Sequence, residues 1–182
     1  MIPTHPINDS LRQVRMGTLL SLMTILFGFG MGGVFGAAEE TLKNDLKTRA
    51  KSAPAEIYKA DEAKMTATID KAWAYYKRAH LHGGAIGTAS LLCALLLAAM
   101  CKPAALTKAL TAFALGLGGL GYSIYWLMAG YRAPAMGSTS AAKDSLEWLA
   151  VPTAGLVMLS LVAVILLAIR EWMLPVANPS SR

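Results

Sequence analysis

The sequence predicts an all-α integral membrane protein, a four-helix bundle with an extramembrane helical hairpin between its first two membrane helices. Hydrophobic residues make up 55% of the 182 positions and charged residues only 15%, against about 25% charged residues in soluble domains. Four apolar stretches have the roughly 20 residues that a helix needs to cross a bilayer. Membrane β-strands are about 10 residues long and alternate in polarity, so the stretches predict helices at 16–38, 83–101, 105–131 and 148–170.

The first apolar stretch carries no charged residue and follows Arg12 and Arg15. This layout, with the small residues 36–38 at its end, is also that of a cleaved signal peptide. However, the run is long for the apolar region of a signal peptide. Small residues also recur at spacing four, a pattern of close helix packing in membranes, at Gly28, Gly32 and Gly36. We therefore expect a retained membrane helix.

The charged segment 39–82 is expected to form the extramembrane hairpin. Pro54 divides it into one helix over about 39–52 and a second helix from Ala55 onward. Apolar residues recur at spacing three or four in the second arm, at Met65, Ile69, Trp73 and Tyr76. Such spacing places them on one face of a helix. Because only Gly83 and Gly84 interrupt the run, we expect one long helix that continues into the second span.

The second span also contains both cysteines of the chain. Cys93 and Cys101 would lie about 12 Å apart along a helix, and a disulfide needs Cα atoms within about 7 Å. Two free thiols are therefore expected. The third span is rich in glycine, at Gly116, Gly118, Gly119 and Gly121. Such residues let membrane helices approach closely, either within the chain, in self-association or with other membrane subunits.

The distribution of basic residues predicts the orientation in the membrane. Four crossings place three basic segments on one side, with Arg12, Arg15, Lys102, Lys108, Arg170 and Arg182. By the positive-inside rule, both termini are expected in the cytoplasm, in a cell inner or plasma membrane. The nine basic residues of segment 39–82 weaken this assignment. Since the basic residues lie between apolar stretches rather than in one patch, the bilayer is the expected partner and nucleic acid is not.

Two histidines stand where the charged segment becomes apolar. On a helix, His80 and His82 point about 200° apart, so one ion cannot be held by both from one face. His80 shares its face with glycines that leave space beside the ring, and we expect it to be the inward histidine. The candidate cofactor-binding residues are His80, His82, Gly84, Gly87 and Tyr76, and the candidate metal ligands are His80 and His82.

Residues 79–87, Ala-His-Leu-His followed by four residues and Gly, resemble a motif of small haem–copper-oxidase-like and nitric-oxide-response-type membrane proteins. In those families the motif A-H-x-H-x4-G begins a membrane helix, and one of its histidines is implicated in haem or metal binding. The resemblance covers nine residues. The families have more helices and more membrane histidines, whereas His5 is the only other histidine here and is expected on the opposite side. A haem bound by two histidines of one chain is therefore not expected.

Two other interpretations of the histidines remain open. In the first, the histidine binds nothing, and its amphipathic ring simply lies among the lipid headgroups at the membrane surface. In the second, it acts as a protonation switch near neutral pH. The first interpretation agrees with the many aromatic residues nearby, which would form a belt at one membrane surface. They are Trp73, Tyr75, Tyr76, Tyr122, Tyr125, Trp126, Tyr131 and Trp148.

The predicted membrane core carries almost no charge, which argues against an ion-coupled transporter. We expect a small subunit of a larger membrane complex that is not an enzyme on its own. In its sharper form it is an electron-transport subunit that holds haem b, a metal ion or a quinone near His80. The alternative is a structural, assembly or scaffold protein without cofactor, whose extramembrane hairpin binds a partner. The scaffold predicts an exposed apolar stripe from Met65 to Tyr76.

Overall fold

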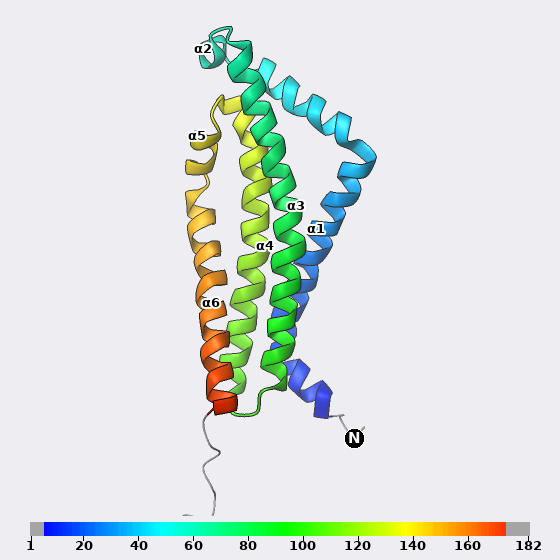
Figure 1. Ribbon diagram of the computed structural model, residues 1–182, viewed down its shortest axis with the longest axis vertical. Helices are drawn as coiled ribbons and strands as arrows, with labels where there is room; N and C mark the ends of the chain where they lie inside the picture. The colour runs from blue at the N-terminus through cyan, green and yellow to red at the C-terminus, as the bar shows by residue number, and fades with distance from the viewer. Residues whose placement is uncertain (1–5, 174–182) are drawn as a thin grey trace, which may run out of the picture.

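The computed structural model describes residues 6–173, and this part of the chain is entirely helical apart from short connections (Figure 1). The elements are α1 Pro6–Lys51, α2 Ala55–Tyr58, α3 Glu62–Ala99, α4 Ala105–Met136, α5 Thr139–Asp144 and α6 Glu147–Met173. By length and apolar composition, α1, α3, α4 and α6 can each cross a membrane. The all-α class and the four long apolar helices are thereby confirmed. His5 and Arg182 lie outside the described residues.

The helix α1 continues well beyond the predicted span but is bent at its end. Ala38 has non-helical backbone angles (φ −141°, ψ 27°), one residue before the apolar run gives way to Glu39. Beyond this kink the helix returns over α3 toward α2 (Figure 1). Salt bridges at spacing four support the returning part, between Glu39 and Lys43 (2.6 Å) and between Asp45 and Arg49 (2.7 Å).

The predicted hairpin between the first two spans does not form a unit of its own. Its first arm is the end of α1, and its second arm is the beginning of α3. The second arm also starts later than expected. Lys59 (φ 50°) and Ala60 (φ 60°) have left-handed backbone angles that end the one-turn helix α2. Asp61 then caps α3 by accepting a hydrogen bond from the Lys64 N–H at 2.8 Å.

The helix α3 is continuous over 38 residues, which confirms the predicted long second helix. At 1.5 Å per residue it is about 57 Å long, whereas the hydrocarbon core of a bilayer is about 30 Å thick. His80 and His82 stand at its midpoint. The predicted span 83–101 begins at this midpoint, and the first half of α3 packs against the end of α1.

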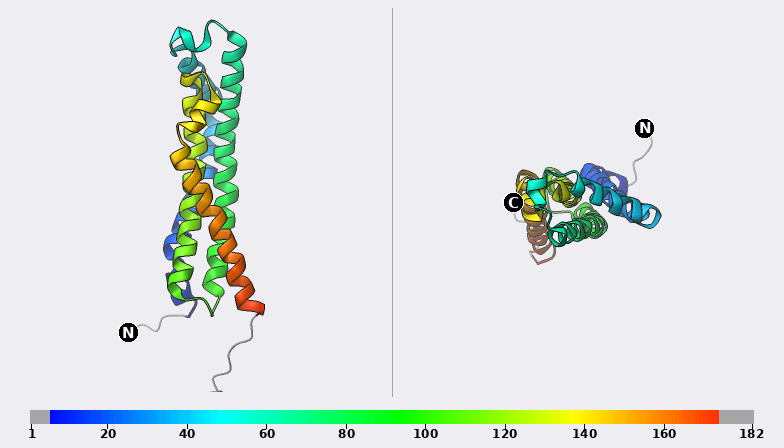
Figure 2. Two further views of the ribbon diagram at one scale, coloured as in Figure 1. Left: turned by 90° about the vertical axis from the view of Figure 1, so that its left-hand side faces the viewer. Right: turned by 90° about the horizontal axis from the view of Figure 1, so that it is seen from above.

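Glycines bring the helix backbones into contact, as the sequence predicts. An added Cβ on Gly83 in α3 would lie 2.7 Å from the Cα of Gly28 in α1, and one on Gly17 in α1 would lie 2.4 Å from the backbone of Ala112 in α4. The helices α1, α3 and α4 form the tightly packed core, and α6 packs mainly on α4. Figure 2 shows the four long helices gathered around one long axis.

The helix α4 runs past its predicted end, to Met136, where Gly137 closes it with a left-handed backbone angle (φ 60°). The tip of the molecule is fixed against this end, because the Tyr58 hydroxyl donates to the Pro134 carbonyl oxygen at 2.6 Å. Burial raises the pKa of Tyr58. The short helix α5, which the sequence did not predict, links α4 to α6 and begins at the Ser138 cap.

At the opposite end, α1 begins, α3 turns into α4, and α6 ends (Figure 1). Lys108 lies at this end and is buried. Its side chain is only 4% exposed, and its Nζ donates to the Met100 carbonyl oxygen at 2.9 Å. The ammonium thereby occupies the C-terminal end of α3, where the helix dipole favours a positive charge.

Candidate functional site

The two histidines of α3 lie on opposite faces of the helix, as their spacing predicts. His80 faces α1, and His82 faces α4. Both rings are half-buried between helices. The expectation that one ring enters the bundle while the other stays at the surface is therefore wrong. They form two separate sites, one on each side of α3.

The His80 ring is fixed against α1. Its Nδ1 lies 2.6 Å from the Gly28 carbonyl oxygen. Since a carbonyl oxygen only accepts hydrogen bonds, Nδ1 carries a proton, and in the neutral imidazole Nε2 then carries the lone pair. The ring also fills the space beside Gly32, where a Cβ would lie 2.7 Å from the His80 Cε1. The Phe35 ring stands edge-on to the imidazole, with 5.8 Å between ring centroids.

This arrangement is typical of histidines that bind metals. A ligating histidine generally donates its other ring N–H to a carbonyl or carboxylate, which fixes the ring and leaves the second nitrogen for the ligand. In residues 8–173 the His80 Nε2 has no hydrogen-bond partner. However, these residues contain no group of three or more His, Cys, Asp or Glu side chains that could hold a metal ion. Further ligands would have to come from elsewhere.

The His82 ring belongs to an aromatic layer between α3 and α4. Its centroid lies 5.4 Å from that of Tyr122 and 6.1 Å from that of Trp126. The Arg78 guanidinium lies over the Trp126 ring, 4.8 Å from its centroid, close enough for a cation–π interaction. The Trp126 indole N–H is buried and has no hydrogen-bond partner among the described residues.

The aromatic residues do not all form the predicted belt around the outside of the bundle. Tyr75, Tyr76, Tyr125 and Trp126 are at most 8% exposed, because they pack between helices. Belt residues face the lipid headgroups. Only Trp148, with 67% exposure, and Tyr131, with 47%, remain largely exposed in this way among these aromatic residues. The other two, Trp73 and Tyr122, are half-buried.

The predicted glycines and Tyr76 do not gather around His80. An added Cβ at Gly87 would lie 2.8 Å from the Ile25 side chain, so α1 fills the space expected there for a cofactor. Gly84 has no atom within 4 Å of such a Cβ. Tyr76 is buried, and its ring packs against Gly130 of α4.

The stripe that the scaffold hypothesis requires to be exposed is largely covered. Tyr76 is 5% exposed and packs with Leu46 of the returning part of α1. Ile69 and Trp73 are half-buried against the same cluster. The Trp73 and Phe35 rings lie 5.0 Å apart, centroid to centroid. This arrangement speaks against the stripe as a docking surface for a soluble protein.

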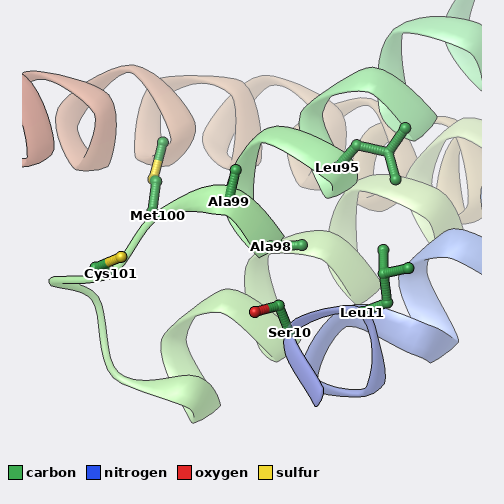
Figure 3. Close-up of a pocket in the computed structure, with 7 residues that line it drawn as sticks. All are labelled: Ser10, Leu11, Leu95, Ala98, Ala99, Met100 and Cys101. Atoms are coloured by element: carbon green, nitrogen blue, oxygen red, sulfur yellow. The ribbon is translucent and has the colours of Figure 1, made fainter. Parts of the chain in front are cut away.

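The sequence missed the residues of α1 that surround His80, namely Gly28, Gly32 and Phe35. The glycine spacing showed a packing face but could not show that an imidazole occupies it. It also missed three surface grooves around the first turns of α1. One of them lies between α1 and the end of α3 and is mostly apolar (Figure 3). Its lining residues are Ser10, Leu11, Leu95, Ala98, Ala99, Met100 and Cys101.

No protein-family model, curated protein or solved structure matches this chain. The resemblance at residues 79–87 therefore stays a prediction, and the function has to be argued from the geometry.

Proposed function

We propose that this protein is a small integral membrane subunit that assembles with another membrane protein through the outward face of α1. The observation that supports this is the placement of its glycines. Those on the inner faces of the helices are in contact with a neighbouring helix, as at Gly17 and Gly28. On the outer face of α1, an added Cβ would meet no atom within 4 Å at Gly30, Gly33 or Gly36.

Glycine has a cost in such a position. It is about 1 kcal/mol less favourable than alanine inside a helix, and lipid contact offers no compensation. In membranes, small residues on one helix face allow a partner helix to approach. Large apolar side chains stand beside the glycines, with Leu26 73% exposed and Phe29 68% exposed. Together they form a surface of ridges and hollows that fits another helix.

The composition of the spans agrees with an assembly role. The apolar stretches 16–38 and 83–101 contain no charged residue. The Lys108 side chain donates a hydrogen bond to the Met100 carbonyl at the end of α3. Ion-coupled transporters generally place ionisable groups along their pathway. We further propose that both termini are cytoplasmic, on the basis of the basic residues near the first turns of α1 and in the α3–α4 turn.

The test is co-purification from the native membrane in mild detergent, with Gly33→Leu as the variant. Gly155→Leu is the matched control, because Gly155 in α6 also has no atom within 4 Å of an added Cβ. We expect the partner to be lost with Gly33→Leu and kept with Gly155→Leu. Equal retention by both variants would refute assembly through this face. A second copy of the chain as the retained partner would define the complex as a self-assembly.

The geometry of His80 supports a second, sharper candidate, an electron-transport subunit. Its Nδ1 is oriented by the Gly28 carbonyl, and its Nε2 is free to bind a haem iron, a metal ion or a quinone oxygen. Because His82 faces α4, the remaining ligand would come from the partner subunit. Within the proposed complex, His80 would then serve as one ligand of a cofactor shared between two chains.

Visible spectra of the oxidised and dithionite-reduced complex test this candidate. A Soret band that shifts on reduction, disappears in His80→Ala and persists in His82→Ala would support a haem at His80. A featureless spectrum without metal in elemental analysis would exclude haem and metal, and extraction of the complex would then show whether a quinone is present. If the complex contains no haem, no metal and no quinone, only the assembly role remains.

A further inference from the structure

We propose that Arg12 and Arg15 bind the phosphate of one anionic diacyl phospholipid, whose two acyl chains lie on either side of the first turns of α1. The two arginines are exposed and separated by one turn of the helix. They border two grooves at once. A ligand with one negative head and two apolar tails matches a pair of cations that two apolar grooves share.

The first groove lies between α1 and α4 and has a volume of about 490 Å³. Beyond the arginines, its walls are Gln13, Ala109 and three large apolar side chains, Met16, Leu110 and Phe113, which are 53%, 58% and 39% exposed. A soluble anion would not require this apolar surface, whereas the acyl chain of a phospholipid would cover it.

The second groove follows the other side of α1 and has a volume of about 510 Å³. It includes Arg12 and Arg15 again, and it leads to Leu11 and to Leu19, which is 53% exposed. Because the two grooves meet at the arginines, one headgroup can serve both. This shared position favours a lipid with two chains over one with a single chain.

The charge of this end of the molecule favours an anion. Within residues 8–173, neither Arg12 nor Arg15 forms a salt bridge. Among the described residues, the basic ones at this end are Arg12, Arg15, Lys102, Lys108 and Arg170, and the acidic ones are Asp9 and Glu171. Glu171 already accepts two backbone hydrogen bonds from the α3–α4 turn. Guanidinium groups bind phosphate oxygens with paired, charge-assisted hydrogen bonds.

At the opposite end of the molecule, basic and acidic residues are nearly balanced, with eleven basic and nine acidic residues in segments 39–78 and 132–147. There, acidic side chains lie close to the basic ones, as in the pairs Glu39–Lys43 and Asp45–Arg49. Lys47 and Lys51 on the same part of α1 are exposed but lie near the acidic Asp70. They therefore provide a matched pair of control positions, because they are also two cations one turn apart on α1.

The experiment is a native mass spectrometry titration of the full chain in detergent, with lipids that differ in one property at a time. Dioleoyl phosphatidylglycerol is compared with dioleoyl phosphatidylcholine for headgroup charge and with its single-chain lyso form for chain number. We expect tighter binding of phosphatidylglycerol than of either comparison lipid. Added NaCl should weaken it, since surface electrostatics is screened by salt.

The variant R12Q/R15Q should bind phosphatidylglycerol about 20- to 30-fold more weakly, since one basic residue near an anionic surface contributes about fivefold. The control K47Q/K51Q should bind like the wild type. Equal binding of phosphatidylglycerol and phosphatidylcholine by the wild type would overturn the proposal, and this result does not depend on how the variant folds. Equal losses in both double variants would overturn the assigned position, and equal binding of the lyso form would overturn the two-groove arrangement.

Discussion

Lys102 and Glu171 bind each other in both directions at the end of the bundle where α6 stops. The Lys102 backbone N–H donates to the Glu171 carboxylate at 2.9 Å, and the Lys102 Nζ donates to the Glu171 backbone carbonyl oxygen at 2.7 Å. The Cys101 N–H donates to the same carboxylate at 3.1 Å. The side chain of each residue thus binds the main chain of the other. This contact attaches α6 to the α3–α4 turn.

The first prediction concerns the acid response of this contact. Hydrogen bonds from the N–H groups of Cys101 and Lys102 hold the pKa of Glu171 below its ordinary value. A carboxylate whose pKa falls on folding stabilises the protein above its ordinary pKa, and the contribution is lost as the pH falls through the lowered value. We expect E171Q to unfold at a lower temperature than the wild type at neutral pH. The difference should shrink between about pH 5 and pH 3.

The measurement is the thermal unfolding of both proteins in detergent over this pH range. E147Q, at the other end of α6, is the control and should keep the acid response of the wild type. An E171Q protein as stable as the wild type at neutral pH would contradict the prediction.

The second prediction compares two neighbouring glycines of α3. At Gly83, an added Cβ would lie 2.7 Å from the Gly28 Cα, whereas at Gly84 it would meet no atom within 4 Å. Gly83→Ala should therefore destabilise the protein by about 1–3 kcal/mol through overpacking against α1. Gly84→Ala should be neutral or stabilise it by up to about 1 kcal/mol, since alanine favours helix. Unfolding by titration with SDS measures the stability of both variants. Similar stabilities would contradict the close contact of α1 and α3 at Gly83.

The third prediction concerns the hydrogen bond between His80 and the Gly28 carbonyl. His80→Ala should destabilise the protein, because it removes both the donor and the ring that packs on Gly32. The hydrogen bond itself contributes about 1 kcal/mol. His80→Asn keeps an N–H donor close to the position of Nδ1 and should recover part of this loss. The same SDS titration measures both variants. Equal stability of the alanine and asparagine variants would indicate that the Nδ1 contact contributes nothing.

The fourth prediction concerns orientation and uses the two free thiols. Cys101 is exposed at the end of the bundle where α1 begins, whereas Cys93 is half-buried in the apolar part of α3. With cytoplasmic termini, a membrane-impermeant maleimide should label Cys101 only after the cells are permeabilised. C101S should abolish the labelling. Labelling of the wild type in intact cells would reverse the proposed orientation.

The sequence predicted the features that depend on length and on local pattern. An apolar run of more than 20 residues identifies a membrane helix wherever it lies in the fold. The change from apolar residues to Glu39 predicted the end of the first span, and α1 is bent at this boundary, at Ala38. The absence of helix breakers between Met65 and Gly83 predicted the continuous α3.

The arrangement of side chains between helices was beyond the reach of the sequence. Helix rotation depends on how two surfaces interlock, so the position of His80 over Gly32 follows from the register of α1 against α3. The aromatic residues illustrate the same limit, because Tyr125 suits a membrane surface as well as an interior. The partner of Lys108 could not be predicted, because it is the backbone carbonyl of Met100 and backbone acceptors leave no trace in the sequence. The left-handed angle at Ala60 has no local signal either, since alanine rarely adopts it.

The continuity of α3 has a mechanical consequence. A helix without a break from Glu62 to Ala99 moves as one rigid body, and the contacts around His80 and His82 lie near its middle. The helix α1, by contrast, is bent at Ala38, six residues beyond the contact of Gly32 with His80, so its two parts have separate directions.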